Sequence, residues 1–213
     1  MVPFRGARGG ESWKSQNQYF WPFPSMMRNR LRYSEAISLT TVASSDDAVA
    51  VYFSANGIFD PNVTGGGHQP YGHDTLANLY NHYRVDKAVI TVRPGSFGSS
   101  LAYGIAITDD TSTDLTDSVM EERERTTYKI MGTAASDVNT GILTMEWRPD
   151  RSYPAAAGAQ KNLNASYGSN PGEQEFFAVW HRRLGTAAAQ TSIYHVQIDY
   201  WVTSYELQQK SQN

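Results

Sequence analysis

The sequence contains no cysteine among its 213 residues, so it forms no disulfide bond, no thiolate metal site and no cysteine nucleophile. It also has no apolar run close to the roughly 18 residues that a membrane-spanning helix needs. The first twenty residues lack the apolar stretch typical of a secretory signal. These features predict a chain without a disulfide framework and without membrane insertion.

The sequence also lacks the short motifs that carry common catalytic chemistry. It has no G-x-S-x-G nucleophile elbow, and Gly65-Gly66-Gly67 is followed by His68 rather than by the lysine of a phosphate-binding loop. Glu146 and Glu175 fall near the ends of predicted strands, but nothing in the pattern pairs them as acid and base. We therefore expect a protein that is not an enzyme.

Aromatic residues and glycines are abundant, with 13 tyrosines, 5 tryptophans, 8 phenylalanines and 17 glycines. This composition is typical of many short strands joined by turns. Residues of alternating polarity, the period of a half-buried strand, recur in eight segments. The predicted strands are 34–42, 47–53, 85–92, 101–107, 128–134, 141–147, 176–181 and 193–203. The last has the most regular alternation, with Tyr194, Val196, Ile198, Tyr200 and Val202 on one face.

One helix is expected between the second and third strands. Residues 75–83 place Leu76, Leu79, Tyr80 and Tyr83 at helical spacing, and Asp74 precedes them as an N-cap. Residues 148–172 are rich in turn-forming residues and predict a long surface loop. The pattern indicates an all-β, eight-stranded antiparallel jelly roll, a two-sheet sandwich with one short helix. We expect an arm at 1–33, a jelly-roll domain at 34–205 and a polar tail at 206–213.

Charge is unevenly distributed along a chain whose net charge is −3. Residues 1–32 carry six cations against Glu11 alone, so the remaining residues are acidic overall. A basic arm on an acidic body is typical of a tail that meets a polyanion. The arm also contains Trp13 and Trp21, which could stack on bases or on a neighbouring subunit. The candidate nucleic-acid-binding residues are Arg5, Arg8, Lys14, Arg28, Arg30 and Arg32.

The loop between the second and third strands is the most distinctive part of the chain. Its sequence, followed by the predicted helix and strand, reads ANGIFDPNVTGGGHQPYGHDTLANLYNHYRVDKAVITV. This stretch of about forty residues resembles the capsid proteins of small circular, Rep-encoding single-stranded DNA viruses. The matching residues are Ala55, Asn56, Gly57, Phe59, Asp60, Pro61, Thr64, Gly65, Gly67, His68, Gln69, Pro70, Gly72, Asp74, Tyr80, Asn81, Tyr83 and Val85. The chain departs from the family at His73, where an aromatic residue is expected, and it lacks the family's long N-terminal run of arginines and lysines.

The resemblance implies a structural capsid protein that assembles with itself into a small icosahedral shell, most simply of sixty copies (T=1). The shell would enclose a single-stranded DNA genome without reading its sequence, and its localisation would be the virion, with assembly in the host nucleus or cytoplasm. The loop would contact the next subunit. The candidate contact residues are Asn56, Asp60, His68, Gln69, Pro70 and His73.

Three alternatives remain open at this level. A jelly roll can also be a carbohydrate-binding module, with Tyr153 and Tyr167 as sugar platforms, or a cupin-like enzyme, which the placement of the histidines disfavours. A coat protein of a small RNA virus has the same features. His68, His73 and His82 lack the repeated spacing of a metal site. A structural calcium ion bridging subunits would use carboxylates such as Asp60, Asp109 or Asp110, because calcium prefers oxygen ligands.

Overall fold

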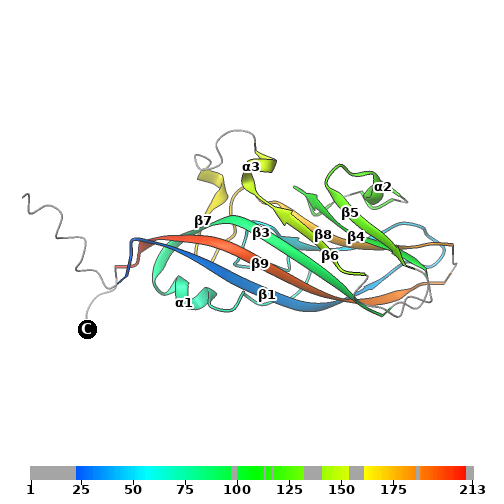
Figure 1. Cartoon of the computed structure of the whole chain (residues 1–213), viewed down its shortest axis with the longest axis horizontal. Helices are drawn as coiled ribbons and strands as arrows, with labels where there is room; N and C mark the ends of the chain where they lie inside the picture. The colour runs from blue at the N-terminus through cyan, green and yellow to red at the C-terminus, as the bar shows by residue number, and fades with distance from the viewer. Residues whose placement is uncertain are drawn as a thin grey trace, which may run out of the picture.

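A computed structural model describes residues 23–96, 100–112, 114–116, 118–131, 141–153, 161–185 and 188–209. Two antiparallel sheets face each other (Figure 1). The first sheet has the order β1 (Met26–Thr40), β9 (Thr191–Leu207), β3 (Tyr80–Ser96), β6 (Leu143–Trp147), and β7 (Asn164–Ser166) also pairs with β3. The second sheet has the order β2 (Val49–Ser54), β8 (Phe176–Arg183), β4 (Leu101–Thr108), β5 (Thr126–Met131).

The order of the strands identifies the fold. The chain passes from sheet to sheet at almost every connection, with β1, β3, β6 and β9 in one sheet and β2, β4, β5 and β8 in the other. This arrangement is the eight-stranded jelly roll, with β7 as an addition. The predicted fold class is confirmed, including the short helix α1 (His73–Ala77) between the second and third strands. The other short helices within the described residues are α2 (Val119–Glu122), α3 (Pro149–Ser152) and η3 (Lys161–Leu163).

Strand β9 is the centre of the first sheet, since it pairs with β1 on one side and β3 on the other (Figure 1). Its predicted inward residues Tyr194, Val196, Ile198, Tyr200 and Val202 are all buried in the main core. Tyrosine is tolerated there because its hydroxyl finds a partner. The Tyr200 hydroxyl, for example, donates to the carbonyl oxygen of Ser54 at 2.7 Å.

A second, smaller core covers the outer face of the second sheet. Trp180 of β8 lies on that face beside small residues of β4. The polar segment between β4 and β5 folds back over them through α2, whose Met120 is fully buried. The outer face of this sheet is therefore partly closed, whereas no described segment folds over the outer face of the first sheet in this way.

The structure corrects several predicted boundaries. The first strand begins at Met26 rather than at 34, because its pairing with β9 continues to the Met26–Tyr205 pair. The helix ends at Ala77, since Tyr80 already belongs to β3. Asp74 is not the N-cap; Gly72 occupies that position with a φ of 89°. The predicted loop 148–172 contains β7, and β9 extends to Leu207, into the predicted tail.

Within the described part of the chain, no helix is both long enough and apolar enough to cross a membrane.

Candidate nucleic-acid interface and subunit-contact loop

Three of the six predicted nucleic-acid-binding cations lie on β1. Arg28, Arg30 and Arg32 alternate with the buried Leu31 and Tyr33, so the arginines face away from the core. All three are exposed. The other three, Arg5, Arg8 and Lys14, lie outside the described residues.

The pairing of β1, β9 and β3 places a tryptophan between two cations on this outer face. Trp201 of β9 is opposite Arg30 on β1 and opposite Lys87 on β3. The Arg30 guanidinium carbon lies 5.2 Å from the Trp201 ring centroid, and the Lys87 ammonium nitrogen lies 4.5 Å from it. Both distances are within the range of a cation–π interaction. The indole therefore orients two positive charges at the surface of the sheet.

Acidic residues pair with some of these cations. Asp199 of β9 accepts hydrogen bonds of 2.7 Å from Arg30 and from Arg32. Burial alone would raise the pKa of Asp199, but the hydrogen bonds from Arg32 and Arg30 outweigh burial and keep the pKa below its usual range. Glu146 of β6 behaves in the same way, because the hydrogen bond from Lys87 lowers the pKa of its carboxyl.

Cations nevertheless outnumber acids on this face. Among the described residues, neither Arg28 nor Arg93 forms an ion pair. A groove of about 390 Å³ lies between β1, β9, β3 and the end of β6. Among its described lining residues the cations are Arg28, Arg30, Lys87 and Arg148, the acid is Asp86, and the uncharged residues are Asn29, Trp201 and Val202. The face combines a half-buried tryptophan with exposed positive charge, which suits a phosphate backbone.

Sequence reasoning found only the β1 part of this face. It did not include Arg84, Lys87 and Arg93 on β3, or Trp201 on β9. The alternation of polarity along β3 and β9 could have placed these side chains outward, but their approach to Arg30 depends on strand register.

The predicted contact loop has both buried and exposed members. Asn56 is buried, where its side-chain amide donates to Glu173 O at 2.7 Å and accepts from Glu175 N at 3.1 Å. It joins the loop to the segment before β8. Pro70 is buried as well. Asp60 and Gln69 are half-buried.

His68 and His73 differ in environment. His68 is exposed and its ring stacks on Tyr33, with centroids 4.7 Å apart. His73 is 3% exposed, and its Nδ1 lies 3.0 Å from Oδ1 of Asp74. The loop therefore presents His68 on its surface and holds His73 inside.

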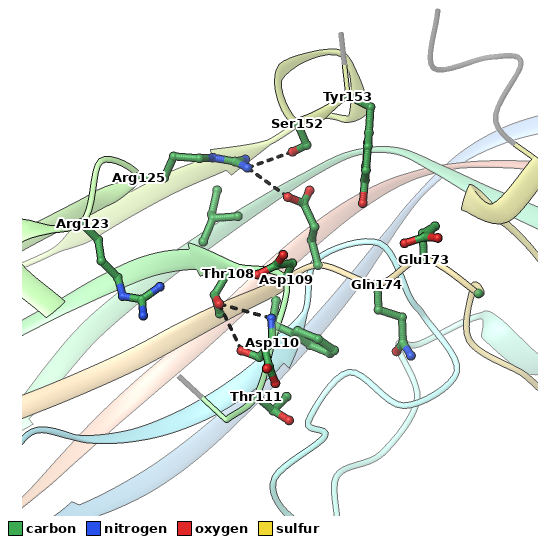
Figure 2. Close-up of a pocket in the computed structure, with 14 residues that line it drawn as sticks. Thr108, Asp109, Asp110, Thr111, Arg123, Arg125, Ser152, Tyr153, Glu173 and Gln174 are labelled. Atoms are coloured by element: carbon green, nitrogen blue, oxygen red, sulfur yellow. Dashed lines mark hydrogen bonds and ion pairs between the residues drawn. The ribbon is translucent and has the colours of Figure 1, made fainter. Parts of the chain in front are cut away.

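A polar pocket of about 660 Å³ lies at one end of the sandwich, beside the ends of β4 and β8 (Figure 2). Arg125 donates hydrogen bonds of 2.9 Å to Ser152 and 3.0 Å to Glu175. Trp147 also donates its indole N–H to Glu175. Figure 2 shows these bonds from Arg125, with the side chain of Tyr153 beside them. The buried carboxylate of Glu175 thus links Arg125 to Trp147 of β6.

The predicted calcium carboxylates do not converge. Asp109 and Asp110 line the pocket of Figure 2, whereas Asp60 lines a different pocket beside the glycine-rich loop. Asp110 accepts hydrogen bonds from the backbone and side chain of Ser112, which lower the pKa of its carboxyl. Over the part of the chain that the structure describes, no three histidine or carboxylate side chains gather in a way that could hold a metal ion.

The tyrosines considered as sugar platforms are not freely exposed. Tyr167 is half-buried, packs on Tyr83 with ring centroids 5.2 Å apart, and shares a 2.7 Å hydrogen bond with Ser204. Tyr153 is half-buried in the pocket of Figure 2, and burial raises the pKa of its hydroxyl. Neither ring offers an open flat face of the kind that stacks on a sugar.

No family model matches the chain, and no curated protein matches its sequence. Solved structures similar to it include the empty head of turnip yellow mosaic virus, with 11% identity over 89% of this chain and 86% of that chain, at a TM-score of 0.46. The 60-mer BFDV capsid protein has 10% identity over 90% of this chain and 100% of that chain, at 0.44. Mud crab tombus-like virus has 10% identity over 99% of this chain and 95% of that chain, at 0.48. The assignment to the jelly-roll class rests on the strand order described above.

Proposed function

We propose that this chain is a viral capsid protein whose copies assemble into a small icosahedral shell around a single-stranded nucleic acid. The observation that carries the proposal is the outer face of the first sheet, where Arg30 and Lys87 flank Trp201 and Arg28 lines the same groove on a jelly-roll scaffold. Phosphates would meet these cations without any reading of base sequence. The role is structural, and its place is the virion.

The finer assignment, to single-stranded DNA and a sixty-copy shell, rests on the resemblance of residues 55–92 to capsid proteins of small circular DNA viruses. In such a shell, the residues that precede β1 would extend inward and add Arg5, Arg8 and Lys14 to the basic face. Assembly would take place in the host nucleus or cytoplasm.

An RNA virus coat protein is the second candidate. A face that contacts phosphates does not distinguish the two nucleic acids, because that distinction needs contacts to the 2′-hydroxyl. The enclosed nucleic acid itself can be identified by treating particles with DNase or RNase after they are opened.

The direct test is the mass of the purified full chain at moderate salt, measured by light scattering and accompanied by negative-stain images and the 260/280 absorbance ratio. Uniform spheres of megadalton mass are expected, with a high ratio if nucleic acid is enclosed. A stable monomer near 23.7 kDa across salt and pH would overturn the proposal.

A further inference from the structure

A cavity of about 590 Å³ opens beside α1, next to the glycine-rich loop. Helix α1, the loop before it, the start of β3 and the turn after β7 form its walls. Its lining combines aromatic rings with side-chain amides, among them Phe59, Gln69, His73, Asn81, Tyr167 and Gln208. Among the residues that the structure describes, no arginine or lysine lines it.

His73, which lines the cavity, has a buried ring nitrogen without a hydrogen-bond partner among the described residues. His73 is held edge-on to Tyr167, with ring centroids 5.3 Å apart, and its Nδ1 faces the Asp74 carboxylate at 3.0 Å. A carboxylate accepts the Nδ1–H proton, and in the neutral ring this leaves Nε2 as an acceptor. That Nε2 atom is buried and has no hydrogen-bond partner among the residues that the structure describes. A buried polar atom left unpaired is costly, so the site favours a donor that enters the cavity.

The same loop presents a donor on its surface. Tyr71 is 94% exposed, the most exposed of the large hydrophobic residues that the structure describes. The backbone around it is held by two hydrogen bonds, from Tyr71 N–H to the Arg32 carbonyl oxygen at 3.3 Å and from His73 N–H to the Pro70 carbonyl oxygen at 3.0 Å. An exposed tyrosine on a fixed loop is typical of an interface anchor, because its ring supplies apolar area and its hydroxyl donates a hydrogen bond.

We propose that Tyr71 of one copy inserts into the His73 cavity of a neighbouring copy and donates its hydroxyl proton to His73 Nε2. The proposal rests on the assembly proposed above and identifies one of its contacts. The charges favour this occupant. The exposed carboxylate of Asp74 and the absence of arginine and lysine from the described lining disfavour a phosphate, whereas a phenol is neutral and matches the acceptor.

The contact also has a defined symmetry. Tyr71 and the cavity are different patches of one chain, so the contact is head-to-tail and closes into a ring when it repeats around a rotation axis. The patches lie close together, because Tyr71 and His73 are two residues apart and their Cα atoms are at most about 7 Å apart. The rotation that carries one copy onto the next therefore moves this region only a short distance. The region must lie near the axis.

The first test uses assembly of the full chain, followed by light scattering over a range of protein concentrations. Tyr71→Phe removes only the hydroxyl and is expected to raise the concentration for half-assembly about fivefold, and Tyr71→Ala at least tenfold. His73→Phe removes the acceptor and is expected to match Tyr71→Phe. The double variant is expected to be no worse than either single one, because both remove the same hydrogen bond.

Folding is the control for these variants. The ring of Tyr71 is almost fully exposed, so circular dichroism and thermal unfolding of the unassembled protein are expected to stay unchanged in Tyr71→Phe and Tyr71→Ala. Shells that form at the same concentration with Tyr71→Ala would overturn the inference and leave the proposed function standing. Failure of the unaltered chain to form any particle would overturn both.

The second test exploits the absence of cysteine. Ser166 is exposed and lines the cavity, so the pair Tyr71→Cys with Ser166→Cys is expected to form disulfides between copies in assembled protein. The non-reducing gel should show a ladder whose last band gives the number of copies around the axis. The matched control pairs Tyr71→Cys with Ile130→Cys, which is exposed on β5 of the other sheet, and should give no ladder. The opposite pattern would overturn the inference.

Discussion

Gly104 lies on β4, where Trp180 of β8 crosses the outer face of the second sheet. A Cβ atom at this position would lie 2.6 Å from the carbonyl oxygen of Thr127 and 2.6 Å from the Trp180 ring. Neither neighbour can move easily, because one is backbone and the other is fully buried. We expect Gly104→Ala to lower the free energy of unfolding by about 2 kcal/mol, measured by urea denaturation of the unassembled protein.

Gly66 provides the matched control, because nothing lies within 4 Å of a Cβ atom built there. Gly66→Ala is expected to change the free energy of unfolding by less than about 0.5 kcal/mol. Equal effects of the two substitutions would show that the space above Gly104 is not limiting.

His181 of β8 is fully buried, with its Nδ1 3.1 Å from the Tyr194 hydroxyl. Burial lowers the pKa of this imidazole to about 4 from an ordinary value of 6.5. The unfolded chain therefore binds the proton more tightly than the folded one, and stability falls as the pH decreases from 6.5 to 4. The shift corresponds to a loss of about 3 kcal/mol at the acidic end.

The measurement is urea denaturation of the unassembled protein at several pH values across this window. His181→Gln retains a hydrogen-bonding group opposite Tyr194 but cannot bind the proton, so its stability should depend less on pH between 6.5 and 4. If the variant and the unaltered chain lose stability in parallel, His181 is not the group responsible.

At the scale of elements, β1 contributes the exposed edge of the basic face. Arg28 has no ion-pair partner among the described residues, so its charge is fully available to a phosphate. Arg28→Gln is expected to weaken single-stranded DNA binding equally for all sequences and to reduce the slope of log K against log salt by about 0.7. Fluorescence anisotropy at several salt concentrations measures both. Arg123→Gln makes the same charge change in the pocket of Figure 2, and an equal loss there would show that only net charge matters.

A substitution at Asp199 of β9 is expected to change the affinity for DNA in the opposite direction. Its carboxylate occupies Arg30 and Arg32, which are 51% and 53% exposed. Asp199→Asn removes this competing anion, so we expect DNA affinity to rise several-fold and its salt dependence to become steeper. A fall in affinity, with the fold intact by circular dichroism, would mean that Asp199 holds the two arginines in their binding positions.

At the scale of the whole molecule, the separation of charge has a consequence for assembly. Residues 1–32 carry six cations and one acid, while the rest of the chain is acidic and the total is −3. Copies without nucleic acid should repel one another, and salt screens this repulsion within a Debye length of about 10 Å at 0.1 M. Assembly of nucleic-acid-free protein is therefore expected to increase with salt in light scattering. A decrease would mean that ion pairs between copies dominate.

The regular alternation of polarity along the sequence determines much of the fold without reference to tertiary contacts. The alternation from Tyr194 to Val202 predicted the central strand and its buried face correctly. The number of such segments, with one short helix between the second and third, predicted the jelly roll. Alternation succeeds because side-chain direction along a strand is a local property with a period of two residues.

The tertiary structure decided what depends on neighbours. Residues 26–33 form part of a strand because each of them pairs with β9. Strand β7 forms within a predicted loop because it pairs with the first half of β3. Register placed Trp201 between Arg30 and Lys87, residues 57 positions apart in the sequence. The environment of His73 likewise comes from Tyr167 and Phe59 on distant segments. Partners of this kind are set by long-range pairing and packing, which local periodicity does not specify.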